Sequence, residues 1–317
     1  MHTLARSHCY GRPFGFGRSG GGPSGHRPPK DKIMTTNGGS SEAESQLRHA
    51  LAADAASLSA RYRLAGLLRS EGRLREAVTE YQRCLALDPS FAPALSGLGR
   101  AYSGLKRVRD AVRAYSAAID ADPSRAAYYF DLGCALQKRG DERGALVAFQ
   151  DAVTRDPNNI AYRQGLALAL YKAGELGRAQ QEYEHCLSST PDDAQLHLGL
   201  GITLVGDHRY ARALESFEEA VRLRPADPRG YVPLGACLFK MGRYETAIDA
   251  INEAVRLGDR SGAAQGQLGA AWLKVGDHRR AMAHFWRVAV ISPLDGSAYR
   301  GMIAVLVDWT IGGSRSN

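Results

Sequence analysis

The sequence is poor in cysteine, contains no long apolar run and has almost no acidic residues in its first forty positions. The 317 residues include five cysteines, an odd number with no Cys-x-x-Cys pair, so neither a disulfide framework nor a zinc site is predicted. Reduced thiols suit a cytosol-like compartment, and we expect a cytoplasmic protein. The longest strongly apolar stretch, residues 301–307, is far shorter than the roughly 18 residues that a membrane-spanning helix needs.

The basic charge of the chain is concentrated in residues 1–40. This segment has six Lys or Arg side chains and one acid, Asp31, so it carries +5 of the net charge of +8. It also holds nine of the 35 glycines and four of the 13 prolines, a composition that predicts a disordered basic tail. Three interpretations stay open here: an organellar transit sequence, a nucleic-acid contact, and a translation start at Met34 that would leave residues 1–33 untranslated.

The remainder of the sequence repeats every 34 residues. The spacing is set out by Pro89, Pro123, Pro157, Pro191 and Pro225, and Pro293 lies two periods further on. Such a period indicates a repeat architecture rather than two separate domains. The units defined by these prolines are 58–91, 92–125, 126–159, 160–193, 194–227, 228–261 and 262–295.

Within each unit, two sets of positions have the spacing of a helix face. Positions 4, 7, 8 and 11 form one stripe of a helix, and positions 20, 24, 27 and 28 form the stripe of a second helix. Position 20 is Ala in all seven units, position 8 is Gly or Ala, and position 24 is aromatic except at Ile251. The small residues allow two helices to approach closely, and the large residue at position 24 fills the space beside them and reaches the next unit. Gly at position 15 suits the left-handed turn between the helices, and Pro at position 32 ends the second helix.

This 34-residue helix–turn–helix unit resembles the tetratricopeptide repeat (TPR). The resemblance implies an all-α fold, an α-solenoid in which about seven TPR units and their capping helices form a right-handed superhelix over residues 41–310. Residues 42–57 match the second helix of a partial unit, and residues 296–310 match one further first helix. We expect these parts to form a single solenoid, followed by disorder in residues 311–317.

In TPR proteins the first helices line a concave groove, which positions 2, 5, 6, 9, 12 and 13 face. The resemblance therefore implies that a peptide or helix of a partner protein binds there. The alternative is that the apolar side chains pack against neighbouring helices and that Lys at position 13 only follows the average repeat. The predicted groove residues are Arg63, Arg100, Phe130, Asp131, Lys138, Leu168, Tyr171, Lys172, Leu198, Ile202, Val205, Val232, Phe239, Lys240, Gln267 and Lys274.

Other chemistry has little support in the residues. TPR proteins that hold a chaperone C-terminus use Lys and Asn at groove positions of adjacent units, and no Asn occurs at position 6 or 9 here, so no carboxylate clamp is predicted. No His has a Cys or His partner at metal-ligand spacing, and no strand precedes a Gly-rich phosphate loop. We therefore expect no enzyme activity, no metal and no cofactor.

Three functions follow from these observations. The first is a non-enzymatic protein–protein interaction scaffold or adaptor that binds a peptide or helix in the groove. The second is a nucleic-acid or anionic-surface binder that acts through the basic tail, because such contacts are electrostatic. The third is a regulatory or targeting subunit of an enzyme encoded elsewhere.

Overall fold

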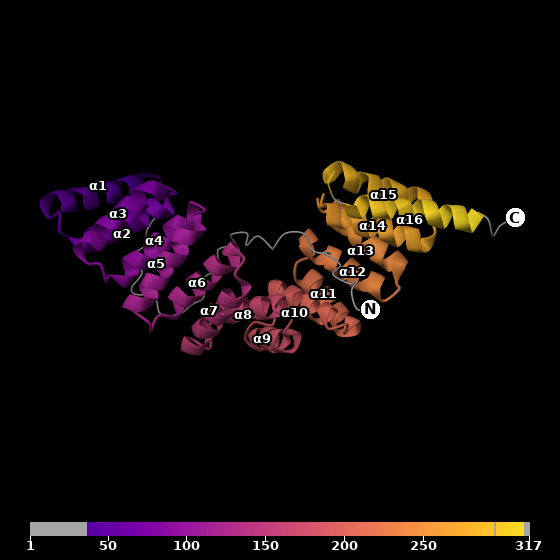
Figure 1. Cartoon of the computed structure of the whole chain (residues 1–317), viewed down its shortest axis with the longest axis horizontal. Helices are drawn as coiled ribbons and strands as arrows, with labels where there is room; N and C mark the ends of the chain where they lie inside the picture. Colours follow the sequence, from indigo (N-terminus) through magenta and orange to yellow (C-terminus); the bar gives the residue numbers. More distant parts are fainter. Residues whose placement is uncertain (1–36, 295, 314–317) are drawn as a thin grey trace, which may run out of the picture. The chain divides into compact units, whose positions relative to one another are not determined.

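The computed structural model describes residues 37–294 and 296–313, and this part of the chain is helical with no strand (Figure 1). The predicted all-α solenoid fold is confirmed. The helices are α1 (Asn37–Ala53), α2 (Leu58–Ser70), α3 (Leu74–Leu87), α4 (Ala92–Gly104), α5 (Val108–Ala121), α6 (Ala126–Arg139), α7 (Glu142–Arg155), α8 (Ile160–Lys172), α9 (Leu176–Ser189), α10 (Ala194–Gly206), α11 (Tyr210–Leu223), the short 3-10 helix η1 (Pro228–Gly230), α12 (Tyr231–Lys240), α13 (Tyr244–Arg256), α14 (Gly262–Val275), α15 (His278–Ile291) and α16 (Gly296–Gly313).

The helices follow the 34-residue units. Each unit contains a first and a second helix, beginning with α2 and α3 in unit 58–91 and ending with α14 and α15 in unit 262–295. A second helix packs on the first helix of its own unit and on the first helix of the next, as α5 does on α4 and α6. The 34-residue register read from the prolines therefore predicts where the two helices of each unit lie in the sequence.

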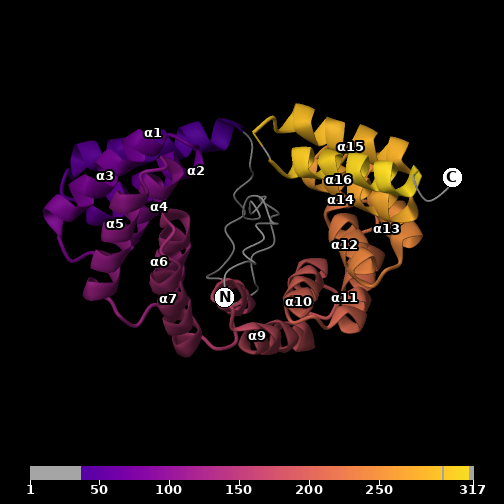
Figure 2. The ribbon, with the colours of Figure 1, turned by 45° about the vertical axis from the view of Figure 1, so that its right-hand side comes forward.

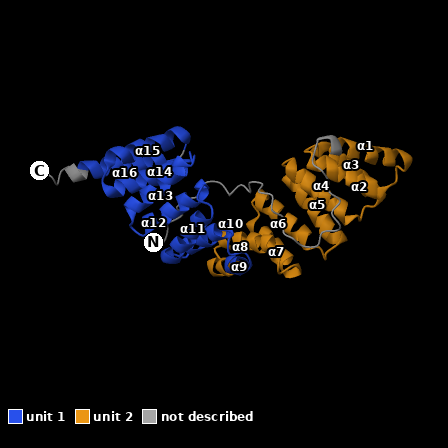
Figure 3. Cartoon of the chain, turned by 180° about the vertical axis from the view of Figure 1, so that it is seen from behind, with its two compact units in different colours: residues 1–21, 183–317 blue, residues 22–182 orange. Residues whose placement is uncertain are grey.

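The described residues divide into two compact units, which Figure 3 colours separately. The boundary falls within α9, between Glu182 and Tyr183. We call residues 37–182 the N-terminal unit and the described residues from 183 onward the C-terminal unit, and treat each by itself. A single continuous solenoid stays a prediction.

The aromatic residue at position 24 holds neighbouring helices together. Phe149 is buried between Gly133, in the first helix of its own unit, and Gly165, in the first helix of the next. A Cβ atom would lie 2.8 Å from Phe149 Cε1 at Gly133 and 3.0 Å from it at Gly165. Because such distances are shorter than ordinary van der Waals contact, a methyl group at either glycine would displace the ring.

The turn between the two helices of a unit has a residue with positive φ at position 15. Five units place glycine there, with φ between 78° and 89°, as the sequence predicted. The other two place Lys106, with φ of 61°, and His208, with φ of 60°. A side chain in this left-handed region is strained.

Both ends of the predicted solenoid need correction. Helix α1 begins at Asn37, so residues 37–40 are helical and do not belong to a disordered tail. The first turn of a helix has N–H groups without intrahelical acceptors, so two glycines are tolerated there once the following residues form the helix. Helix α16 continues to Gly313 instead of ending at 310, because no inter-helix turn interrupts it at position 15. Residues 1–36 and 314–317 lie outside the described residues, as do the predictions that concern them.

Candidate functional site

We define the first-helix face as the surface formed by positions 2, 5, 6, 9, 12 and 13 of the first helices. In the N-terminal unit it is formed by α2, α4, α6 and α8, which contact one another in that order. All eight predicted site residues of this unit lie there. Phe130, Asp131, Leu168 and Tyr171 are half-buried, whereas Arg63, Arg100, Lys138 and Lys172 are exposed.

The aromatic and apolar residues on this part of the face rest on the core. The ring of Phe130 packs against Phe149 at 5.6 Å and against Tyr162 at 5.0 Å between centroids. Tyr171 contacts the same cluster of buried residues. Their remaining exposed surface is available to a partner, but each also supports the fold.

An ion pair links two adjacent first helices of the N-terminal unit. Arg100 Nε on α4 donates to Asp131 Oδ2 on α6 at 2.8 Å. Burial raises the pKa of Asp131, and the neighbouring guanidinium offsets part of that rise. One turn along α6, burial raises the pKa of the Cys134 thiol to about 12. Asp131 is thus a carboxyl group in a desolvated site, and Arg100 lowers its pKa relative to the effect of burial alone.

The lysines at position 13 differ in their partners. Lys172 Nζ lies 3.4 Å from Glu142 Oε1 at the start of α7. Lys138 forms no ion pair with any described residue, and neither does Arg63. These two cations therefore remain free to attract an acidic group.

Two residues at position 12 belong to this face although the sequence analysis did not select them. Arg69 Nε on α2 and Gln137 Nε2 on α6 are buried nitrogen atoms without a hydrogen-bond partner in the described structure. Buried donors usually find an acceptor, and the described residues supply none to either atom. Both residues stand at position 12, like the predicted groove residue Tyr171, and could have been identified from that position.

In the C-terminal unit, the first-helix face is formed by α10, α12, α14 and α16, again in contact in that order. Its predicted residues include Ile202 and Val205 on α10 and Val232 and Phe239 on α12, all half-buried. The ring of Phe239 packs edge-on against Tyr244 at 5.3 Å. Gln267 is half-buried, and its Oε1 atom is buried without a partner among the described residues.

Two exposed lysines border these apolar side chains. Lys240 on α12 and Lys274 on α14 occupy position 13 of successive units, and neither forms an ion pair within the described residues. Leu273 on α14, at position 12 like Val205 and Phe239, extends the apolar part of the face. Leu273 is absent from the predicted groove residues, whose apolar members all lie in residues 126–261.

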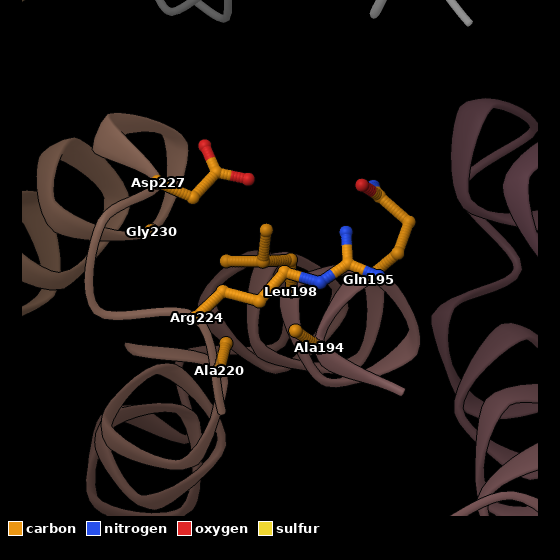
Figure 4. Close-up of a pocket in the computed structure, with 7 residues that line it drawn as sticks. All are labelled: Ala194, Gln195, Leu198, Ala220, Arg224, Asp227 and Gly230. Atoms are coloured by element: carbon orange, nitrogen blue, oxygen red, sulfur yellow. The ribbon is translucent and has the colours of Figure 1, made fainter. Parts of the chain in front are cut away.

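Leu198 departs from the prediction. Its side chain is only 5% exposed, so it offers little surface to a partner. It lines a small pocket together with Ala220 of α11, Arg224 directly after that helix, and Gly230 of η1 (Figure 4). The turn η1 brings the next unit against Leu198, which makes this position part of the core.

The pocket beside Leu198 is too small for a cofactor. Its interior is about 10 Å³, close to the volume that one water molecule occupies. Figure 4 shows the guanidinium of Arg224 extending past Leu198 toward Gln195. A second hollow, between Tyr102 on α4 and Arg113 on α5, is open. In the described residues, no three His, Cys, Asp or Glu side chains are grouped to hold a metal ion.

The described helices contain no candidate membrane span, since none is both long and apolar enough. The cytoplasmic location itself stays a prediction. The predictions for the N-terminal tail, including its nucleic-acid role, concern residues outside the described part of the chain.

Solved structures confirm the fold. A chain of the APC/C hetero-tetramer Cut9–Hcn1 matches with a TM-score of 0.63 at 17% identity, over 84% of this chain and 52% of that chain. PilF of Pseudomonas aeruginosa matches with a TM-score of 0.57 at 19% identity, over 67% of this chain and 96% of that chain. YrrB, described as a TPR protein with an unusual peptide-binding site, has a TM-score of 0.52 at 24% identity, covering 57% of this chain and 94% of that one. The chain therefore spans about half the length of the first of these proteins.

Comparison with known protein families finds tetratricopeptide repeats along the chain. They match at residues 68–132 and 204–266, at 36–90 and 165–228, and at 126–159. No curated protein matches the sequence significantly. The matched residues include helices of both compact units, and the match at 126–159 coincides with one 34-residue unit read from the prolines. The chain belongs to the tetratricopeptide repeat family.

Proposed function

We propose that the protein is an adaptor that binds a peptide or helical segment of a partner protein on its first-helix face. Membership of the TPR family supports a protein–protein interaction scaffold in general. The observation that carries the finer proposal lies in the C-terminal unit. There, half-buried apolar side chains on adjacent first helices are bordered by lysines that have no acidic partner in the described structure.

The chemistry of this surface defines the ligand. Ile202, Val205 and Phe239 present apolar area that a partner would remove from water, at about 25 cal/mol per Å². Lys240 and Lys274 lie along the same face and attract negative charge. An amphipathic segment with apolar side chains on one side and Asp or Glu beside them satisfies both requirements.

The N-terminal unit is suited to an acidic ligand in a different way. Arg63 and Lys138 are exposed cations on this face. Asp131 is the acidic residue among the predicted site residues, and Arg100 already neutralises it. This face therefore favours carboxylates, with fewer apolar contacts than that of the C-terminal unit.

The test begins with a random peptide library displayed on phage and selected on the 317-residue protein. Affinity of a selected peptide is then measured by fluorescence anisotropy for the protein and for a Lys240→Glu, Lys274→Glu variant. Because both lysines are exposed and unpaired, the fold should be unaffected, whereas reversing two charges should weaken binding about tenfold or more.

Arg279→Glu with Arg287→Glu is the matched control, since both residues are exposed on the second helix α15. The control should bind within about twofold of the original protein, since its charge changes lie off the first-helix face. Equal loss in both variants would show that only net charge matters, and unchanged binding in the first variant would refute the proposed surface.

A further inference from the structure

Helix α16 occupies the place of a first helix in an eighth unit. It lies along α15, as Figure 2 shows, and it contacts α15 through positions 3, 6 and 10. Ala298 and Val305 are fully buried there, and a Cβ atom at Gly301 would lie 2.4 Å from the ring of Phe285. Gly97, Gly165 and Gly199, at position 6 of their first helices, likewise lie close to the aromatic ring of the unit before.

The opposite face of α16 is apolar and exposed. Tyr299, Ile303 and Leu306 stand at positions 4, 8 and 11 and are 48%, 60% and 52% exposed. In the seven full units, position 8 is always buried, and position 11 is buried in all but the last. The second helix of the same unit covers these positions, and among the described residues no such helix covers α16.

Helix α1 has the converse arrangement at the other end of the described chain. Ala43, Leu47 and Ala50 stand at positions 20, 24 and 27, which belong to a second helix. All three positions are buried in each full unit, yet Ala50 is exposed and the other two are half-buried. Leu47 packs on the core cluster of α2 and α3, and no first helix of the same unit packs on α1 within the described residues.

We propose that α1 of one copy of this protein docks on α16 of a second copy and completes an eighth repeat. Helix α16 has no second helix and α1 has no first helix among the described residues, and this contact would pair the two. The contact is head-to-tail, so it uses different surfaces on the two copies and generates open chains or closed rings.

The paired positions are compatible in size and charge. In full units the large residue stands at position 24 and the small one at position 8, whereas here Ile303 stands at position 8 and Leu47 replaces the aromatic ring. Position 4 elsewhere pairs with position 23, as Arg61 does with Glu80 at 3.0 Å. The corresponding residues here are Tyr299 and Gln46, so the contact buries no unpaired charge.

Two variants test the proposal in the full chain by sedimentation velocity at increasing concentration. Ala50→Glu and Ile303→Glu each place a carboxylate at the centre of the contact, and both residues are exposed in the single chain, so folding should be unaffected. The unaltered protein should self-associate with concentration, and each variant should remain monomeric. An equimolar mixture of the two should form dimers and nothing larger, because one intact α1 and one intact α16 remain.

Matched controls lie on the same helices. Ala52→Glu is at position 29, which is exposed in every full unit, and Ala304→Glu is at the exposed position 9 of α16. Both should associate like the unaltered protein. A protein that stays monomeric at all concentrations would overturn the proposal. So would association that Ile303→Glu abolishes and Ala50→Glu leaves intact, because that result indicates a symmetric contact between two α16 helices.

Discussion

Lys106 lies in the left-handed conformation that five other units give to glycine at the same turn. Its φ is 61°, its side chain is exposed, and that side chain makes no hydrogen bond or ion pair with the described residues. Replacing it with glycine therefore removes strain without removing a contact. The Lys106→Gly variant should be more stable than the original protein.

The size of the gain follows from two opposing effects. The left-handed conformation costs a residue with a Cβ roughly 1–2 kcal/mol. Glycine loses about 0.4–1 kcal/mol more conformational entropy on folding. The net stabilisation should be about 0.5–1 kcal/mol. The reverse change, Gly140→Ala, should cost a similar amount from backbone strain alone, because no atom lies within 4 Å of the added Cβ.

Urea denaturation followed by circular dichroism measures both changes as shifts in the midpoint at an unchanged slope. His208→Gly is an internal comparison, and its gain should be smaller because His208 Nδ1 lies 2.8 Å from the Tyr210 hydroxyl and this contact would be lost. A Lys106→Gly variant that is less stable than the original, or a Gly140→Ala variant that is more stable, would refute the reasoning about this turn.

Three further outcomes are expected. Gly97→Ala should lower the free energy of unfolding by about 1–3 kcal/mol, because the added Cβ would lie 2.4 Å from the buried ring of Tyr81. Urea denaturation measures this loss, and an unchanged free energy of unfolding would contradict the close packing. Burial, and then Arg287, lowers the pKa of His284, so the unfolded chain binds the proton more readily and stability should fall as the pH drops below about 6.5. Denaturation midpoints at two pH values should show this fall reduced in His284→Gln. Burial raises the pKa of Cys134 to about 12 and that of Cys84 to about 11, so peptide-resolved mass spectrometry should find both alkylated far more slowly at neutral pH in the folded protein than in denaturant.

The repeat could be predicted because each unit contains the residues that end its own helices. Pro at position 32 and Gly at position 15 act on the local backbone, so they mark helix ends without knowledge of the tertiary contacts. Gly258 has the same role where the repeat lacks its proline: it has φ of 100° and follows the end of the second helix α13, just before Asp259. Position 24 was predictable for a similar reason, because its size pattern recurs in every unit.

The surroundings of two predicted groove residues depend on contacts between units, which the sequence pattern does not give. Leu198 stands at position 5, like the half-buried Phe130 and Val232, but it is only 5% exposed and lines a small pocket with Gly230 of the following unit. Asp131 was selected as a groove residue, whereas its pairing with Arg100 on the preceding first helix depends on how two units stack. The exposure of the apolar face of α16 was not predicted, because its apolar pattern is that of any first helix.

Site-specific photo-crosslinking of a selected peptide tests the proposed binding face most directly. A benzophenone amino acid would replace Lys240, on the first-helix face of the C-terminal unit, or Glu218, which is exposed on the second helix α11. The proposed function predicts crosslinks to the peptide from position 240 and none from position 218. Crosslinks from position 218 alone would contradict it, because they would place the partner on the second helices.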